Sequence, residues 1–430
     1  MPGNELPLVT ALPFLALLLV IALGPLIVPR WWHQNRNKAL VSVAISAPLL
    51  VYLGIHAPEL LHEKFHEYLG FIVVIAALFV IAGGIHIQGS LAGTPLVNTG
   101  VLGLGAVLAN LLGTTGASVL LIRPLLRANK RRKRVAHIVI FFIFIVANCG
   151  GLLTPMGDPP LLLGYLKGVP FDWTLRLWPQ WLTLNGILLV IFNCWDRWAL
   201  DKDEKEELVH EPLRITGGLE MLVLLGVIVT IVAAGRAAAL GRPWGQNIRE
   251  LFIILLALFG YFAGSGERRA KNAFSFGPII EVAVLFAAIF ATMAPVLEML
   301  NVWAQRPDFA LTKPAHFFWA SGALSSVLDN APTYLAFAAS AAGLQGVVPH
   351  GAYIGTMILN PDAAKLLAAI STGAVCMGAN TYIGNAPNFM VKAIAEENGV
   401  KMPSFFGYLG YSIGILGPMY IAISLIFFRT

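Results

Sequence analysis

Residues 147–160 have the sequence Ala-Asn-Cys-Gly-Gly-Leu-Leu-Thr-Pro-Met-Gly-Asp-Pro-Pro, and residues 374–387 have Ala-Val-Cys-Met-Gly-Ala-Asn-Thr-Tyr-Ile-Gly-Asn-Ala-Pro. At this constant offset of 227, six of the fourteen positions are identical. The identical pairs are Ala147/Ala374, Cys149/Cys376, Gly151/Gly378, Thr154/Thr381, Gly157/Gly384 and Pro160/Pro387. Weak internal symmetry with an interrupted apolar segment in each half is the pattern in which membrane transporters place their binding sites.

The composition of the chain places it in a lipid bilayer. Of its 430 residues, 57% are hydrophobic and 12% are charged, whereas a soluble domain carries about 25% charged residues. The net charge is +6, but most basic residues lie in loops between apolar stretches, where they set membrane topology instead of binding nucleic acid. We therefore expect a multi-pass protein of the inner (cytoplasmic) membrane, with the lipid bilayer as a partner and no nucleic-acid partner.

Twelve apolar stretches recur along the chain, and crossing a hydrocarbon core takes about 20 residues. Polar runs that contain Gly or Pro cut two of them, 99–126 and 315–340, at mid-depth. We predict an all-α polytopic fold in which these two are re-entrant hairpins and about ten other segments cross the membrane. The ten are 8–28, 39–55, 69–88, 138–165, 174–195, 217–235, 248–266, 278–300, 366–395 and 405–428.

The basic residues support this topology. With two hairpins, one side of the membrane holds 17 Lys or Arg in five loops, namely 30–38, 127–137, 196–215, 267–276 and 399–404. The opposite side holds 7 in the loops 56–68, 166–173, 236–247, 301–314 and 341–365. The positive-inside rule then places the first set in the cytoplasm and both termini outside. The two hairpins should open to opposite sides.

The repeat divides the chain into two halves. Residues 1–205 hold the leading spans and repeat 1, with its hairpin 99–126 and its broken helix 138–165. Residues 206–430 hold repeat 2, with its hairpin 315–340 and its broken helix 366–395. Loop 196–215, with its charged run 201–207, is predicted to be a solvated linker between these two inverted-topology repeats.

Each broken helix should expose backbone at mid-depth. Pro159 and Pro160 lack N–H groups and Gly157 has little helical preference, so residues 154–160 should be unwound, and residues 381–387 likewise. Bare carbonyls and amides in the membrane each cost several kcal/mol unless they are buried in protein or line a cavity. Ion coordination is the use we expect.

Oxygen-bearing side chains in the broken helices and at the hairpin tips suit a small hard cation. The predicted ion- or substrate-binding residues are Asp158, Asp329, Asn330, Thr333, Asn385, Thr114, Thr115, Ser118, Thr154, Thr381, Asn380 and Asn388. Asp158 and Asp329 are the candidate Na⁺ ligands among them. We expect no catalytic residue and no resident cofactor, only transported Na⁺ or Li⁺ and H⁺.

The two acidic residues inside broken elements carry the functional hypothesis. A carboxylate inside a membrane is costly and marks an ion or proton pathway by default. Burial favours its protonated form and a bound cation favours its ionised form, so one carboxylate can exchange a proton for a cation. For both Asp158 and Asp329 a helix-capping role is the alternative, and either residue can cap and bind at once. Arg123 is a candidate anion ligand, with snorkelling to the interface as its alternative.

At these motifs the chain resembles the ion transporter superfamily, and within it most closely the NhaD-type sodium/proton antiporters, with citrate and arsenite carriers as relatives. The resemblance rests on 157–160 (Gly-Asp-Pro-Pro), 328–333 (Leu-Asp-Asn-Ala-Pro-Thr) and 384–388 (Gly-Asn-Ala-Pro-Asn), and it spans nearly the whole chain. It implies a homodimer, a scaffold, and a transport domain that holds both hairpins and both broken helices and moves like an elevator.

The Asp-Asn pair at 329–330 resembles the antiporter branch, whereas the Ser-Asn-Thr signature of the dicarboxylate branch is missing from both hairpin tips. The expected function is therefore sodium (cation)/proton antiport by a secondary transporter, and the alternative is symport of citrate or another carboxylate with a cation.

Two intramembrane aspartates also characterise intramembrane aspartyl proteases. The Tyr-Asp and Gly-x-Gly-Asp signatures of those enzymes do not occur at Asp158 or Asp329, so we do not expect an enzyme.

Overall fold

The computed structural model describes every residue except 1–5, 91, 201–210, 246 and 430. It is 77% helical with almost no sheet, and ten helical segments among the described residues are long and apolar enough to cross a membrane. These ten include the predicted hairpin segment Pro95–Ala128 but not the predicted span 248–266, where the helix Ile248–Ala263 has only 16 residues. The predicted all-α polytopic fold class is confirmed.

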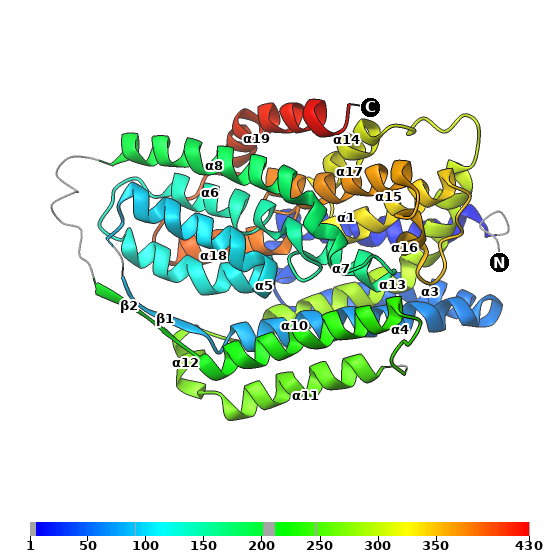
Figure 1. The fold of residues 1–430 in the computed structure, drawn as a ribbon, viewed down its shortest axis with the longest axis horizontal. Helices are drawn as coiled ribbons and strands as arrows, with labels where there is room; N and C mark the ends of the chain where they lie inside the picture. Colours follow the sequence, from blue (N-terminus) through cyan, green and yellow to red (C-terminus); the bar gives the residue numbers. More distant parts are fainter. Residues whose placement is uncertain (1–5, 91, 201–210, 246, 430) are drawn as a thin grey trace.

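Six long helices form what we call the scaffold layer. In the layer, α13 contacts α1, α3 and α4, while α4 contacts α10 and α11. Figure 1 shows α4, α10 and α11 running side by side along one edge of the molecule. The six are α1 (Leu12–Ile27), α3 (Asn35–His56), α4 (Pro58–Ala82), α10 (Gly218–Ala239), α11 (Ile248–Ala263) and α13 (Gly277–Ala304), joined by the short elements η1 (Leu8–Ala11), α2 (Pro29–Trp32) and α12 (Gly266–Lys271).

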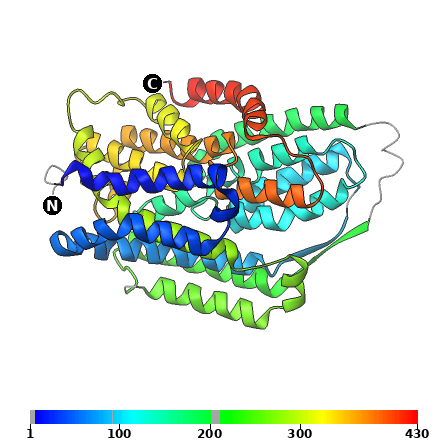
Figure 2. The same cartoon turned by 180° about the vertical axis from the view of Figure 1, so that it is seen from behind.

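The remaining helices form a second layer, which we call the core. Repeat 1 supplies α5 (Pro95–Ala128), α6 (Ala136–Ile145), η2 (Cys149–Leu153), α7 (Pro159–Leu166), η3 (Trp173–Leu177) and α8 (Trp178–Ala199). Repeat 2 supplies α14 (Pro314–Ser325), α15 (Asn330–Leu344), α16 (Tyr353–Met357), α17 (Pro361–Met377), η4 (Gly378–Asn380), α18 (Ala386–Glu397) and α19 (Phe405–Phe427). The repeats interlock, because α18 packs on α5 and α6, an arrangement visible from behind in Figure 2.

The segment Pro95–Ala128 is the first hairpin. It breaks at Gly113, whose φ of 75° and ψ of 157° lie outside the helical region and suit only a glycine. The two arms come back together at their base, where the side chains of Asn98 and Asn129 exchange two hydrogen bonds of 2.9 Å. The predicted hairpin 99–126 is confirmed, with four further residues in the first arm and two in the second.

The second hairpin consists of α14 and α15. Its arms turn at Ser326–Asp329, and the rings of Phe317 and Phe337 pack across it with centroids 6.3 Å apart. The predicted hairpin 315–340 is confirmed and extends to Leu344.

The two hairpins have their bases at opposite ends of α4. Near the start of α4, Glu63 accepts a hydrogen bond of 3.0 Å from the Gly351 N–H, in the loop that follows the second hairpin. Just after the end of α4, the Ile87 carbonyl accepts from Arg127, at the end of the first hairpin, at 3.1 Å. Figure 1 shows the same arrangement, with α5 reaching toward the end that carries β1 and β2 and α15 toward the other end.

Three of the basic loops meet at the end of the molecule where the first hairpin has its base. The Asn35 amide donates to the Gly277 carbonyl at 2.9 Å, so loop 30–38 lies beside loop 267–276. The Asn272 amide donates to the Ile85 carbonyl at 2.6 Å, close to the Ile87 carbonyl that holds Arg127. This clustering is what the predicted topology requires.

A short antiparallel ribbon, β1 (His86–Ser90) with β2 (Glu211–Thr216), was not predicted. It pairs His86 with Thr216 and Ile87 with Ile215, and pairing supplies hydrogen bonds to backbone that runs across the end of the scaffold layer. The predicted linker therefore continues into a strand at its C-terminal side. The charged run 201–207 and the predicted boundary between residues 205 and 206 lie outside the described residues.

Candidate functional site

The two broken helices have the same backbone geometry. In the first, Thr154 (φ −135°, ψ 156°) and Asp158 (φ −148°, ψ 149°) are extended between η2 and α7. In the second, Thr381 (φ −137°, ψ 165°) and Asn385 (φ −151°, ψ 137°) are extended between η4 and α18. Both predicted breaks are present, and their backbone conformations match at the sequence offset of 227. Each is two residues shorter than predicted, 154–158 and 381–385, because Pro159 and Ala386 already begin α7 and α18.

Equivalent side-chain bonds tie each broken helix to its hairpin. Asn110 in the first hairpin donates to the Ala106 carbonyl at 2.9 Å and to the Gly150 carbonyl at 2.7 Å. Ser326 in the second donates to the Gly322 carbonyl at 2.8 Å and to the Met377 carbonyl at 3.1 Å. The hairpin residues are related by an offset of 216 and the broken-helix residues by 227, so the internal repeat extends to its hydrogen bonds.

Two glycines allow each unwound segment to fold back on itself. A Cβ on Gly151 would lie 2.8 Å from the Gly157 carbonyl oxygen, and a Cβ on Gly384 would lie 2.6 Å from the Gly378 oxygen. Real Cβ atoms do not approach backbone this closely. Any residue other than glycine would therefore push apart the two backbone segments that contact each other in the break. Packing therefore explains why glycine occupies both repeat-related pairs.

Asp158 lies at the centre of the core, where both repeats meet. Its side chain is 1% exposed and makes no capping bond to α7, so the capping alternative is not the role seen here. The Thr114 hydroxyl donates to Oδ1 at 2.7 Å and the Asn385 amide to the same oxygen at 3.3 Å. The Asn330 amide donates to Oδ2. The carboxylate thus receives one donor from each hairpin tip and one from the other broken helix, and all three are uncharged.

Asp329 and Asn330 form the tip of the second hairpin. Asp329 caps α15, because its Oδ1 accepts from the Ala331 N–H at 3.0 Å, and it is only partly buried. Asn330 is fully buried, and its Oδ1 has no hydrogen-bond partner within the described part of the chain. Ser118 Oγ in the first hairpin is buried and unpartnered in the same sense. A buried oxygen without a donor is available to a cation.

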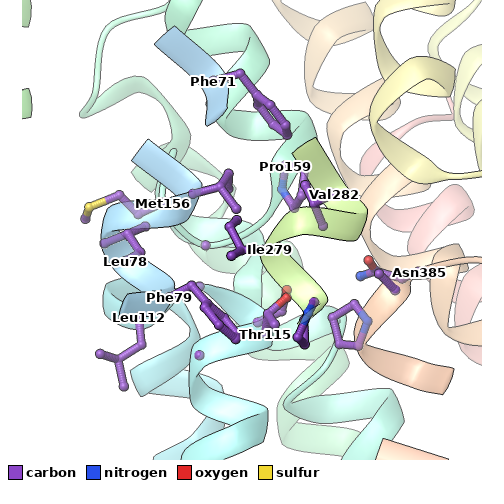
Figure 3. A pocket seen from close by; sticks show the side chains of 18 of the residues that line it. Phe71, Leu78, Phe79, Leu112, Thr115, Met156, Pro159, Ile279, Val282 and Asn385 are labelled. Atoms are coloured by element: carbon purple, nitrogen blue, oxygen red, sulfur yellow. The ribbon is translucent and has the colours of Figure 1, made fainter. Parts of the chain in front are cut away.

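A cavity of about 70 Å³ lies between the core and the scaffold layer, and one water needs about 10–15 Å³. Thr114, Thr115, Asp329 and Asn385 line it on the core side. The opposite wall is apolar and comes from α4 and α13. Figure 3 shows Phe71, Leu78, Phe79, Ile279 and Val282 around it, with Thr115 and Asn385 facing the same space. Asp158 lies behind the wall formed by its neighbours Gly157 and Pro159.

Five other predicted site residues bond to backbone carbonyls or, in the case of Asn380, to a neighbouring side chain. Thr154 donates to the Asn110 carbonyl at 2.5 Å, and Thr381 donates to the Ser326 carbonyl at 2.6 Å. Thr333 donates to the Asp329 carbonyl at 2.9 Å, and the Asn380 amide donates to Ser326 Oγ at 2.8 Å. Asn388 donates to the carbonyls of Gly378 and Thr381, both at 2.8 Å. These five residues do not reach the Asp158 carboxylate by any hydrogen bond of the described chain.

Asn148 is a site residue that the sequence analysis missed. It is fully buried and lies where the two broken helices cross. Its amide donates to Asn388 Oδ1 at 2.7 Å, and its Oδ1 accepts from the Asn385 amide at 3.2 Å. Its repeat-related residue is Val375, so the repeat alignment gave no signal for it. Cys149, next to it, is buried and lies close to the repeat-related Cys376, so the pseudo-twofold axis of the two repeats passes near this pair.

Positive charge is missing from the cavity wall. No Lys or Arg is among its described lining residues, and Arg123, the candidate anion ligand, donates to the Asn272 carbonyl at 3.3 Å near the end that carries β1 and β2. The described residues also contain no group of three His, Cys, Asp or Glu side chains placed to hold a metal ion. The site therefore combines carboxylate, amide and hydroxyl oxygens with an apolar lid.

Comparison with known proteins gives one match. The model of a family described as "Putative citrate transport" matches residues 3–428, nearly the whole chain, while no curated protein matches. A resemblance to the ion transporter superfamily is confirmed by this family, whereas the closer likeness to the NhaD type stays a prediction. The chain belongs to this citrate transport family of the ion transporter superfamily, and it is a multi-pass membrane transporter.

Proposed function

We propose that this transporter is a sodium (or lithium)/proton antiporter in which Asp158 and Asp329 exchange a cation for protons. One observation carries the proposal: the buried Asp158 carboxylate receives three uncharged donors and forms no ion pair among the described residues. An unpaired buried carboxylate is costly, so it takes either a proton or a cation. Alternating between those two partners is cation/proton exchange.

The chain's own residues divide the work. Asp158 would supply the charge, while the unpartnered Asn330 Oδ1 and the Thr114 hydroxyl would supply neutral oxygens to a hard cation. Asp329, at the cavity wall, would pass the ion or proton between the cavity and Asp158. Asn385 and Asn148 would keep the carboxylate in place from the second broken helix. The transported ions are substrates, and no resident cofactor is proposed.

Alternating access is proposed to be a sliding of the core against the scaffold layer. The cavity wall from α4 and α13 is apolar, so the core has no specific polar bond to break at the cavity itself. The polar bonds between the two layers lie elsewhere, as between Glu67 and Lys167. Both hairpins and both broken helices belong to the core, so they can move as one body. From the resemblance to the ion transporter superfamily, we also propose that the protein forms a homodimer through the scaffold layer. We propose an inner-membrane location as well.

A second candidate is symport of citrate or another carboxylate with cations, and the description of the family favours it. The absence of Lys and Arg from the described cavity wall means that a tricarboxylate would have to enter with bound cations. The two functions share the cation site and differ in what fills the cavity.

Proton flux in proteoliposomes separates the two candidates. A pH-sensitive dye would report on one preparation that receives sodium, lithium, potassium and then citrate. We expect dequenching with sodium or lithium alone. A response that needs citrate would replace the antiporter by the carboxylate symporter, and uptake of radiolabelled citrate would confirm that replacement.

A further inference from the structure

The first turns of α4 carry two histidines, His62 and His66, in the run His-Glu-Lys-Phe-His. Residues four apart on a helix lie on one face. Here the two Nε2 atoms are 3.1 Å apart, and the ring centroids are 4.4 Å apart with the planes at 68°. One Nε2 donates a hydrogen bond to the other, so both rings present the same nitrogen on one side of the helix, and a metal ion between them would replace the shared proton.

This separation is what a shared metal ion requires. Zinc–imidazole bonds are about 2.0–2.1 Å long, so two nitrogens on one ion lie about 2.9–3.4 Å apart for bond angles between about 90° and 110°. His62 is exposed and His66 is half-buried, so the pair can be reached from solution. The site faces the side of the membrane opposite to the basic loops.

We propose that His62 and His66 bind one divalent transition-metal ion, of the class Zn²⁺, Ni²⁺ or Cu²⁺, through their Nε2 atoms. Imidazole nitrogen suits these ions, whereas Mg²⁺, Ca²⁺ and Na⁺ prefer oxygen. No third His, Cys, Asp or Glu completes a group with them in the described chain, so water would fill the remaining positions. This site is independent of the cation site at Asp158.

The site binds a metal without hydrolytic chemistry. In a zinc peptidase, the Glu of a His-Glu-x-x-His helix is the general base. Here Glu63 is engaged elsewhere, because it accepts from the Gly351 N–H at 3.0 Å and lies 3.4 Å from the Lys167 ammonium. Those partners belong to the core, and they hold the carboxylate away from the point where the two imidazoles converge.

Titration of the purified, tag-free protein in detergent with Zn²⁺ tests the proposal, with a fluorescent zinc indicator as competitor. We expect one Zn²⁺ per chain, unaffected by excess Ca²⁺ or Mg²⁺. His62→Gln and His66→Gln should each weaken binding by more than the roughly 10- to 100-fold that loss of a second-shell partner costs. X-ray absorption on the zinc-loaded protein should show two imidazole ligands.

His56→Gln is the matched control. His56 is also exposed, but its ring stacks on Tyr52 and its Nδ1 lies 2.9 Å from the Tyr52 carbonyl, so its loss should leave zinc binding unchanged. Equal binding by the wild-type protein and both His variants would overturn the site, as would an equal loss in all three variants. Because both rings lie on the outer face of α4, an intact elution profile is expected for every variant.

Discussion

Thr154 and Thr381 make the same hydrogen bond in the two repeats, to the carbonyls of Asn110 and Ser326 at 2.5 and 2.6 Å. The symmetry between the two repeats does not extend to the two acidic residues of the site. Asp158 has Asn385 as its repeat partner at the offset of 227, and Asp329 has Gly113 at the offset of 216. Each repeat therefore contributes one carboxylate, from the broken helix in the first and from the hairpin tip in the second.

Asp158→Asn should abolish cation-dependent proton flux and leave the protein folded. Asparagine has nearly the same shape and already occupies the equivalent position 385, but it cannot exchange a proton for a cation. Asp308→Asn, in an exposed loop, is the control and should transport normally. Full flux by Asp158→Asn in proteoliposomes would mean that this carboxylate is not part of the transport cycle.

Moving the charge across the axis tests the symmetry itself. In the double variant Asp158→Asn/Asn385→Asp, the carboxylate should stay near its donors, because the Asn385 amide lies 3.3 Å from Asp158 Oδ1. We expect partial recovery of flux relative to Asp158→Asn. No recovery, with an unchanged elution profile, would show that the donors from the hairpin tips recognise only the first position.

Asp329 makes a capping bond, so its test has to separate the cap from the charge. Asn and Ser are both good N-cap residues, and Asp329→Asn and Asp329→Ser should therefore keep thermal stability close to that of the wild-type protein. If the charge serves transport, both variants lose cation-dependent flux. Normal flux in both would assign Asp329 to capping alone.

Gly113 can be compared with a glycine in the same hairpin arm. Gly113→Ala forces a Cβ into a positive-φ conformation, 3.2 Å from the Met156 carbonyl oxygen, and should cost about 1 kcal/mol or more. Gly100→Ala meets no atom within 4 Å in a helix and should stabilise by about 0.5–1 kcal/mol. Thermal unfolding in detergent should move in opposite directions, and a parallel shift would argue against strain at the tip.

The positions of the helices and of their breaks could be predicted from the sequence better than the contacts between them. Proline and glycine set the breaks predicted at 154–160 and 381–387 through local backbone chemistry, so both could be located without the structure to within two residues. The role of Asp158 as the centre of the site could also be predicted from the sequence, because a carboxylate beside a break in a membrane helix marks an ion or proton pathway by default. Thr114, Asn330 and Asn385 were named as candidates, and the structure brings all three to it.

What escaped prediction depends on how distant segments pack. Asn148 sits in an apolar run, and only the crossing of the two broken helices shows that it bonds Asn385 and Asn388. The cavity wall from α4 and α13 consists of ordinary apolar residues such as Phe71 and Ile279, which look the same whether they face lipid or a site. The ribbon of β1 and β2 is short, and its pairing over more than 120 residues leaves no local periodicity.

Asn148→Ala should weaken cation affinity more than it lowers the maximal rate. It removes the acceptor of Asn385 and the donor to Asn388, each worth about 1 kcal/mol, so the half-saturating cation concentration should rise about fivefold or more. Asn193→Ala, which removes a 2.8 Å bond to Thr99 far from the site, is the control. Equal affinities in both variants would remove Asn148 from the site.

Glu67 and Lys167 join the scaffold layer to the core near the N-terminal end of α4. Their side chains are 12% and 3% exposed, and Lys64 also binds Glu67, at 2.9 Å. Burial and the neighbouring Lys64 lower the pKa of Lys167, while Glu67 and Glu63 oppose this. Glu67→Gln should therefore leave two buried ammonium groups with only Glu63, 3.4 Å from Lys167, beside them. The protein should lose up to about 3–5 kcal/mol of stability, the cost of an uncompensated buried charge.

This loss should shrink as the pH rises. A lysine whose pKa is lower in the folded state binds more protons when unfolded, so stability increases as the pH rises through the folded pKa.

Replacing Lys167 as well, in Glu67→Gln/Lys167→Met, should restore most of the thermal stability at neutral pH. If the core slides against the scaffold layer during transport, this ion pair has to break in each cycle, so the double variant should still transport. A stable double variant without flux would instead make the pair a required part of the moving interface.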